Sequence, residues 1–141
     1  MTDSNQLPPR INGERLWNSL MEMAKHGATA KGGVCRLALT DSDIAGRDLF
    51  CSWCRDTGLD VRVDQVGNIL ARRQGRNRAA NTVATGSHVD SQPTGGKFDG
   101  VYGVLAVPIV WWHHARHRRH RHNPEDTRSH KGATYVATTT D

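Results

Sequence analysis

The sequence is poor in large aliphatic residues and in cysteine. Leu, Ile, Val and Phe number only 26 among 141 residues, and cysteine occurs three times. An odd number of cysteines does not suit a disulfide framework. The longest uncharged run in the later half, Val101 to Trp112, is shorter than the roughly 20 residues that a membrane helix needs. The sequence therefore argues against a disulfide-rich miniprotein and against a membrane protein.

A secretory leader is also missing from the sequence as given. Residues 1–10 contain Pro8-Pro9 but no apolar stretch of the kind that a signal peptide requires. We therefore expect a cytoplasmic protein without a membrane partner. The length suits one domain, and a net charge of +5 is too small to indicate a wholly disordered chain.

Histidine and positive charge are concentrated at the C-terminal end. Six of the eight histidines lie in residues 107–141, and the run 113–122 contains only His, Arg and Ala. Such a segment buries too little apolar surface to offset its ordering entropy. We expect a body over residues 1–106 and a low-complexity, disordered His/Arg-rich tail over 107–141. The run could chelate metal or contact phosphates, but it lacks aromatic residues for base stacking, which favours a solvated tail.

The body alternates between helical and extended patterns. Asn12 and Thr40 are predicted N-caps, and Thr40-x-x-Asp43 resembles a capping box. The predicted elements are helices over 12–26 and from 41 to Gly58, a half-exposed strand over 59–64, a strand over 69–71 after a Gly67-Asn68 turn, a buried strand over 82–88, and a helix from Val101. This order predicts an α/β layer architecture.

The most informative stretch is the polar segment that follows the last predicted strand. His88 and Asp90 are two residues apart, so an extended backbone points both side chains to one side. His88 could bind a divalent metal, and Asp90 could fix the orientation of its ring. Asp99 follows a glycine-rich loop, and its carboxylate could bridge two ions about 3.5–4 Å apart. An ordinary polar strand end with a glycine turn is the simpler interpretation, and spacing alone favours it.

Cys51-Ser52-Trp53-Cys54 has the C-x-x-C spacing of redox and zinc motifs. There is no second pair, and Cys35 is not suitably spaced for a zinc site. The motif falls within a predicted helix, so we interpret both cysteines as small packing residues.

The body resembles the hydantoinase/carbamoylase-type amidases, a family that includes N-carbamoyl-L-amino-acid hydrolase, allantoate amidohydrolase and β-ureidopropionase. The densest similarity is the string Gly95-Gly96-Lys97-Phe98-Asp99-Gly100 and its continuation to Ala106. Further matching residues are Ile11 to Trp17, Gly32 to Ala38, Asp43, Arg47, Trp53, Gly58-Leu59, Asp64 to Asn68 and Gly86 to Asp90. This resemblance favours the metal interpretation of the polar segment.

The resemblance implies the N-terminal part of a two-metal, aminopeptidase-like αβα catalytic domain. It makes His88 a ligand of the first metal, Asp90 the residue that steadies its ring during catalysis, and Asp99 the bridging carboxylate. The implied cofactor is a pair of divalent ions, Zn or Mn. The implied partner is a small carbamoyl or ureido substrate, and the family dimerises through an inserted domain that this chain lacks.

The chain departs from the family pattern after Ala106. Family members continue to a Glu-Glu pair that supplies a general base and a ligand, and no Glu-Glu occurs here. We therefore expect an incomplete amidohydrolase, from a truncated gene or a shifted reading frame, that is inactive alone on N-carbamoyl amino acids. One alternative is a small His/Arg-rich protein that binds metal or nucleic acid, although we expect no nucleic-acid partner. Another is an intact but different small hydrolase, against which the missing proton acceptor counts.

Overall fold

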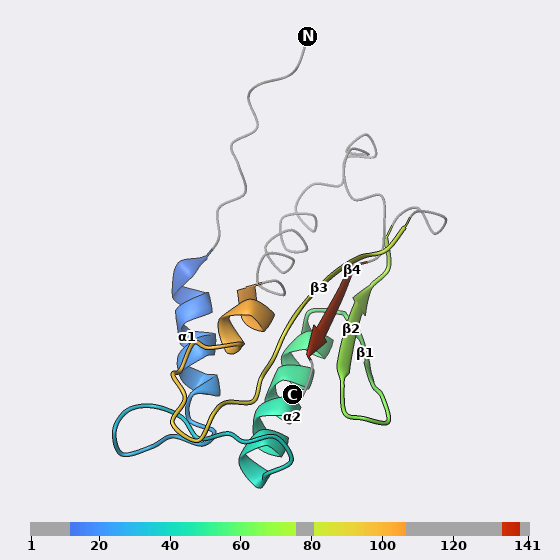
Figure 1. Cartoon of the computed structure of the whole chain (residues 1–141). Coiled ribbons are helices and arrows are strands. Elements are labelled where there is room, and N and C mark those ends of the chain that lie inside the picture. Colours follow the sequence, from blue (N-terminus) through green and yellow to red (C-terminus); the bar gives the residue numbers. More distant parts are fainter. Residues whose placement is uncertain (1–11, 76–80, 107–133, 139–141) are drawn as a thin grey trace.

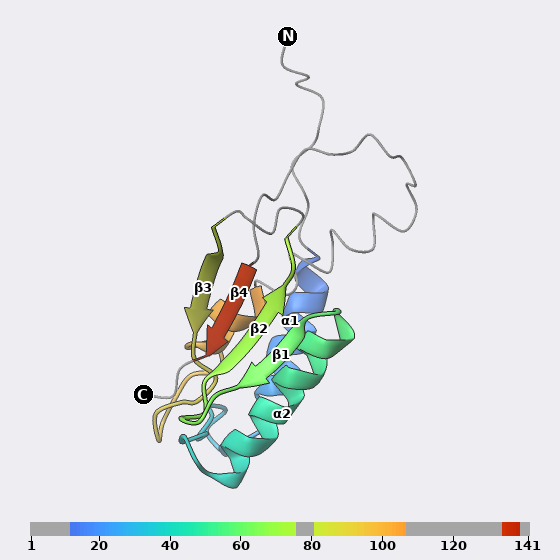
Figure 2. The same ribbon diagram turned by 90° about the vertical axis from the view of Figure 1, so that its right-hand side faces the viewer.

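The structure is a computed structural model, and it describes residues 12–75, 81–106 and 134–138. Its elements are α1 (Gly13–Met23), α2 (Asp41–Asp56), β1 (Asp60–Val63), β2 (Ile69–Arg73), β3 (Val83–Ser87) and β4 (Thr134–Thr138), together with a helical stretch over residues 101–106. The described helices lie on one side of a single four-stranded sheet (Figures 1 and 2). The α/β architecture predicted from the sequence is confirmed.

Both long helices begin at the predicted caps. The Asn12 side chain accepts a hydrogen bond from the Arg15 amide at 2.9 Å, and Thr40 Oγ1 accepts one from the Asp43 amide at 3.4 Å. The Asp43 carboxylate accepts from the Leu39 amide at 3.1 Å, one residue before the cap, so the predicted capping box is present in modified form. After α2 the chain turns at Gly58, whose φ of +78° favours glycine.

The turn between β1 and β2 is organised by Asp64. Its Oδ1 accepts hydrogen bonds from the amides of Val66 at 3.0 Å and Asn68 at 2.8 Å, and Gly67 has a φ of +93°. The two strands then pair antiparallel, with Asp60 opposite Arg72 and Val63 opposite Ile69. The predicted turn and both predicted strands are confirmed.

The strand order in the sheet is β1-β2-β4-β3. β4 pairs antiparallel with β2 and parallel with β3, where Val83 lies opposite Thr134 and Ser87 opposite Thr138. The prediction that the C-terminal tail lacks fixed structure is wrong for residues 134–138, because their β-branched and aromatic residues suit a strand between two others. The run 113–122 lies outside the described residues. The predicted boundary after residue 106 coincides with the end of the described range 81–106.

β3 differs from its prediction as a buried strand. Residues 83–86 are exposed, and only Ser87 is half-buried. The reason is its position: β3 is an edge strand, whereas α2 contacts β1 and β2. A run of small residues such as Ala84 and Gly86 therefore indicated an extended strand but not how deeply it is buried.

The core lies between the helices and the sheet. Its buried members come from every layer and are Leu20, Met23, Phe50, Cys51, Cys54, Leu59, Ile69, Ala71, Val89, Val101, Val104 and Leu105. Cys51 and Cys54 are free thiols, and burial raises the pKa of both, that of Cys54 to about 12. The C-x-x-C motif therefore serves packing in α2, as interpreted from the sequence. No helix among the described residues is long and apolar enough to cross a membrane.

Candidate functional site

The polar segment predicted from the sequence leaves the carboxyl end of β3. His88 follows the last residue of β3, and the chain then loops through residues 91–100 into the helical stretch that begins at Val101 (Figure 1). β3 and β4 are parallel, so their carboxyl ends meet at the same edge of the sheet. Open α/β sheets place their ligand sites at this edge.

His88 and Asp90 are in direct contact. The Nδ1 atom of His88 lies 3.1 Å from Oδ1 of Asp90 and 3.1 Å from the Asp90 carbonyl oxygen. A carbonyl oxygen only accepts, so Nδ1 is the donor to Asp90, and in the neutral ring this leaves the lone pair on Nε2. The side chains are 31% and 15% exposed, which leaves the imidazole accessible and the carboxylate largely enclosed.

The ring of His88 lies against the backbone of Gly100. A Cβ at Gly100 would stand 2.4 Å from Cε1 of His88 and 2.5 Å from both ring nitrogens, and the φ of Gly100 is +66°. The Ser87 hydroxyl donates to the Gly100 carbonyl at 2.8 Å, which joins the start of the segment to its end. The glycine-rich loop therefore permits the close backbone approach that the sequence predicted.

Asp99 lies next to this contact in the chain, and its side chain is exposed. Its carbonyl accepts from the Val101 amide at 2.7 Å, at the start of the helical stretch. Among the described residues no interaction joins the Asp99 carboxylate to His88 or Asp90, and no group of three or more His, Cys, Asp and Glu residues could hold a metal ion. The structure thus brings His88 and Asp90 together and leaves Asp99 beside them without a contact.

The donor types at this site fit a divalent metal. An imidazole nitrogen and a carboxylate are ligands of both Zn²⁺ and Mn²⁺. A metal ligand must also be oriented, and the His88 ring is oriented by the space that Gly100 leaves for it and by the contact of Nδ1 with Asp90. Two donors are fewer than the three protein ligands of a usual catalytic zinc site, so the described residues fit part of such a site.

Arg36 is a further residue of this site, and the sequence did not predict it. It is 1% exposed, and its Nε donates to the Val89 carbonyl at 2.7 Å, between His88 and Asp90. Burial lowers the pKa of the Arg36 guanidinium, and the nearby carboxylates of Asp43 and Asp90 raise it. The only signal in the sequence is a charged residue within the apolar stretch around Val34 and Leu37, which does not reveal its distant partner.

Asp43 is the second buried charge near the segment. Its Oδ2 accepts from the Leu39 amide, and its Oδ1 has no hydrogen-bond partner among the described residues. Burial raises the pKa of Asp43, while the Leu39 amide, Arg47 and Arg36 act in the opposite direction. Asp43 thus contributes an incompletely satisfied carboxylate to the interior beside Arg36.

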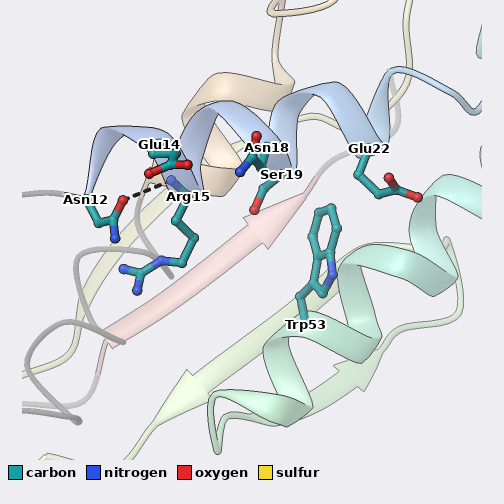
Figure 3. A pocket seen from close by; sticks show the side chains of 7 residues that line it. All are labelled: Asn12, Glu14, Arg15, Asn18, Ser19, Glu22 and Trp53. Atoms are coloured by element: carbon teal, nitrogen blue, oxygen red, sulfur yellow. Dashed lines mark hydrogen bonds between the residues drawn. The ribbon is translucent and has the colours of Figure 1, made fainter.

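A separate depression of about 410 Å³ lies between α1 and α2 (Figure 3). The residues that line it are Asn12, Glu14, Arg15, Asn18, Ser19, Glu22 and Trp53. The predicted site residues His88, Asp90 and Asp99 are not among them. The depression and the polar segment are therefore different features of the molecule.

Comparisons with known proteins find amidohydrolases among the relatives of this chain. The chain is 55% identical over 97 residues to an N-carbamoyl-L-amino-acid amidohydrolase of Rhizobium meliloti, a match that covers 69% of this chain and 23% of that protein. It is 42% identical over 92 residues to the allantoate amidohydrolase of Bacillus subtilis, covering 62% of this chain and 21% of that protein. A comparison with models of protein families found no match.

Solved structures agree with these relatives. A hydantoinase/carbamoylase family amidase from Burkholderia multivorans superposes with a TM-score of 0.83 at 50% identity, over 94% of this chain and 30% of that one. The aminopeptidase PepT from Bacillus cereus has a TM-score of 0.68 at 15% identity, over 92% of this chain and 37% of that one, which is a likeness of fold.

The chain therefore has an α/β fold that these amidases and the aminopeptidase share, and it covers part of each of those chains. More particularly, the chain is related to the hydantoinase/carbamoylase family of amidases. It spans about a quarter of the length of the curated relatives that it matches.

Proposed function

We propose that the described residues are part of the catalytic domain of a metal-dependent amidohydrolase. The substrates would be N-carbamoyl amino acids or related ureido compounds, because relatives at 55% and 42% identity carry the names of enzymes for such substrates. The observation that carries the proposal is the oriented His88 ring, held between Asp90 and Gly100 with Nδ1 toward Asp90 and Nε2 on the other side of the ring.

In this proposal His88 Nε2 and the Asp99 carboxylate are two donors to a divalent metal site for Zn²⁺ or Mn²⁺. Asp90 acts on His88 by accepting from Nδ1, which fixes the tautomer and the ring plane. A bound divalent ion would supply Lewis-acid activation for the hydrolysis of an amide-type C–N bond. The two-ion arrangement of the family would require further donors, since the described residues contain no cluster of three.

We also propose that residues 1–106 belong to this catalytic domain and that the sequence after residue 106 is a His/Arg-rich segment outside the family pattern, of which residues 134–138 add β4 to the same sheet. The basis is the concentration of histidine after residue 106 and the lack of a Glu-Glu pair anywhere in the sequence. Hydrolysis at a metal centre normally needs a positioned proton acceptor. The 141-residue chain by itself is therefore proposed to lack amidase activity.

The proposal is tested by observing His88 while zinc is added. Because the chain has eight histidines, total metal uptake would not identify the site. Imidazole nitrogens of the ¹⁵N-labelled full chain are instead followed by long-range ¹H–¹⁵N NMR, with His88→Ala used to assign the His88 signals. We expect Zn²⁺ to shift Nε2 of His88, and Asp99→Asn to weaken this response.

The matched control is Asp56→Asn, because Asp56 is an exposed carboxylate at the end of α2, outside the segment. This variant should respond to zinc as the unaltered chain does. A His88 signal that stays unchanged while other imidazoles saturate would overturn the proposal.

A further inference from the structure

Arg36 holds both ends of the peptide that contains Asp90. Its amide donates to Ser91 Oγ at 2.8 Å, and its carbonyl accepts from the Ser91 amide at 2.7 Å. Its Nε donates to the Val89 carbonyl at 2.7 Å. Val89 and Ser91 are buried, at 2% and 6% exposed, so these bonds form in the interior, where water cannot replace them.

The opposite side of the guanidinium is anchored to the end of α1. Nη1 of Arg36 donates to the Met23 carbonyl at 3.1 Å and to the His26 carbonyl at 2.8 Å. Met23 is the last residue of α1 and His26 lies in the turn that follows, where the negative end of the helix dipole favours a cation. The planar, forked guanidinium therefore connects a rigid helix end to the backbone between His88 and Asp90.

A glycine in α2 leaves the space that Arg36 occupies. A Cβ at Gly46 would stand 2.8 Å from Cδ and 3.2 Å from Nε of Arg36, and Gly46 is itself buried. Alanine is the better helix former, by about 1 kcal/mol. Glycine at this position therefore leaves room for the Arg36 side chain, although alanine would stabilise the helix more.

We propose that Arg36, seated against Gly46, is a positioning residue for the His88–Asp90 pair. It acts through the backbone of Val89 and Ser91, which alternate with His88 and Asp90 along the segment. This inference rests on the proposed function, because it assigns Arg36 the task of orienting a metal ligand. Its geometric part, the control of the His88 ring, holds without metal and is measurable by itself.

The experiment compares Arg36→Lys and Gly46→Ala in the full chain. Lysine keeps the charge but cannot donate in two directions from a planar fork. Alanine at position 46 keeps Arg36 and displaces its side chain. The control is Gly13→Ala, which also adds a methyl group to a helix, at a position where nothing lies within 4 Å.

The first readout is the tautomer of His88 without metal, from long-range ¹H–¹⁵N NMR. We expect the unaltered chain and Gly13→Ala to show the Nδ1–H form. Arg36→Lys and Gly46→Ala should show a mixture of both tautomers, because the Asp90 acceptor is no longer fixed. A purely structural role would lower the unfolding temperature and leave the tautomer of the folded protein unchanged.

The second readout is the zinc response of His88. Loss of an outer partner of a metal ligand weakens metal binding about 10- to 100-fold, so we expect at least a 10-fold higher Kd in both variants. An Nδ1–H tautomer and a zinc response unchanged in folded Gly46→Ala would overturn the inference. If the His88 signals of the unaltered chain do not change when zinc is added, the proposed function fails. The tautomer readout still decides the role of Arg36 in that case.

A measurement on the unaltered chain covers the case in which neither variant folds. The Nε–H proton of Arg36 donates to a buried carbonyl, so it should exchange slowly with solvent and show a nuclear Overhauser effect to Val89 or Asp90. Rapid exchange of this proton would mean that the guanidinium does not hold the segment, and would overturn the inference.

Discussion

The imidazole of His88 donates through Nδ1 to the carboxylate of Asp90 at 3.1 Å, with its ring seated on the backbone of Gly100. Two residues that are two positions apart in the sequence thereby define one oriented nitrogen, Nε2, at the carboxyl end of β3. The contact between His88 and Asp90 is local in the sequence. Arg36, which donates to the Val89 carbonyl between them, lies 53 positions away in the chain.

Asp90→Asn should weaken divalent-metal binding at His88. An amide offers a weaker acceptor to Nδ1 than a carboxylate and can rotate to present its NH₂ group. We expect a 10- to 100-fold higher Kd for Zn²⁺, measured from the His88 Nε2 signal. Asp56→Asn serves as the control, and equal affinities in the two variants would show that the Asp90 charge does not act on His88.

Gly100→Ala should destabilise the fold, because the new Cβ would meet the His88 ring at 2.4 Å in a backbone with a φ of +66°. Strain of this kind costs about 1–3 kcal/mol, which urea unfolding can measure. Gly96→Ala is the matched control, since nothing lies within 4 Å of its added methyl group. A loss no larger than that of the control would mean that the ring does not lie against Gly100.

Asp43 should make stability fall as the pH rises above the ordinary range for aspartate. Its folded-state pKa is raised by burial, so the folded protein binds the proton more tightly than the unfolded chain. The stability that protonation supplies is fully present below the unfolded pKa and is lost as the pH rises through the folded pKa. Asp43→Asn should flatten this part of the curve of unfolding free energy against pH, whereas a curve of unchanged slope would contradict the assignment.

Cys51 and Cys54 should resist alkylation in the folded protein. Both are buried, and the pKa of each thiol is raised, so little thiolate forms at pH 8. Cys35 is half-buried and should react first with iodoacetamide. Mass spectrometry should find one modified thiol in the native chain and three after unfolding, and rapid native labelling of Cys54 would show that α2 packs differently.

The chain alone should not hydrolyse N-carbamoyl amino acids. Purified protein with Zn²⁺ or Mn²⁺ should give only the background rate, because the described residues offer two candidate donors, no group of three that could hold a metal ion, and the sequence has no Glu-Glu pair. Turnover above background that disappears in His88→Ala would contradict this expectation.

The elements fixed by local interactions were predictable from the sequence. Asn12 and Thr40 cap their helices through bonds that span three residues, and Asp64 closes its turn through bonds that span two and four. The pairing of His88 with Asp90 is equally local, and the period of an extended backbone indicated it.

The features that failed or were missed depend on distant partners. β4 lies in the segment that was predicted to be disordered because it is rich in histidine and arginine. Its pairing with β2 and β3 involves residues far away in the sequence, which no local pattern indicates. The burial of β3 depends on its place at the sheet edge. Arg36 has no local pattern at all, since its partners lie on α1 and beyond β3.

The central claim is that His88 and Asp99 contribute to one divalent-metal site. It is tested most directly by adding Mn²⁺ in substoichiometric amounts to the ¹⁵N-labelled full chain and recording which amide signals broaden. We predict early broadening at His88, Asp90, Asp99 and Gly100, which His88→Ala and Asp99→Asn each reduce. Broadening confined to residues 113–122, with the signals of the polar segment unchanged, would contradict the account.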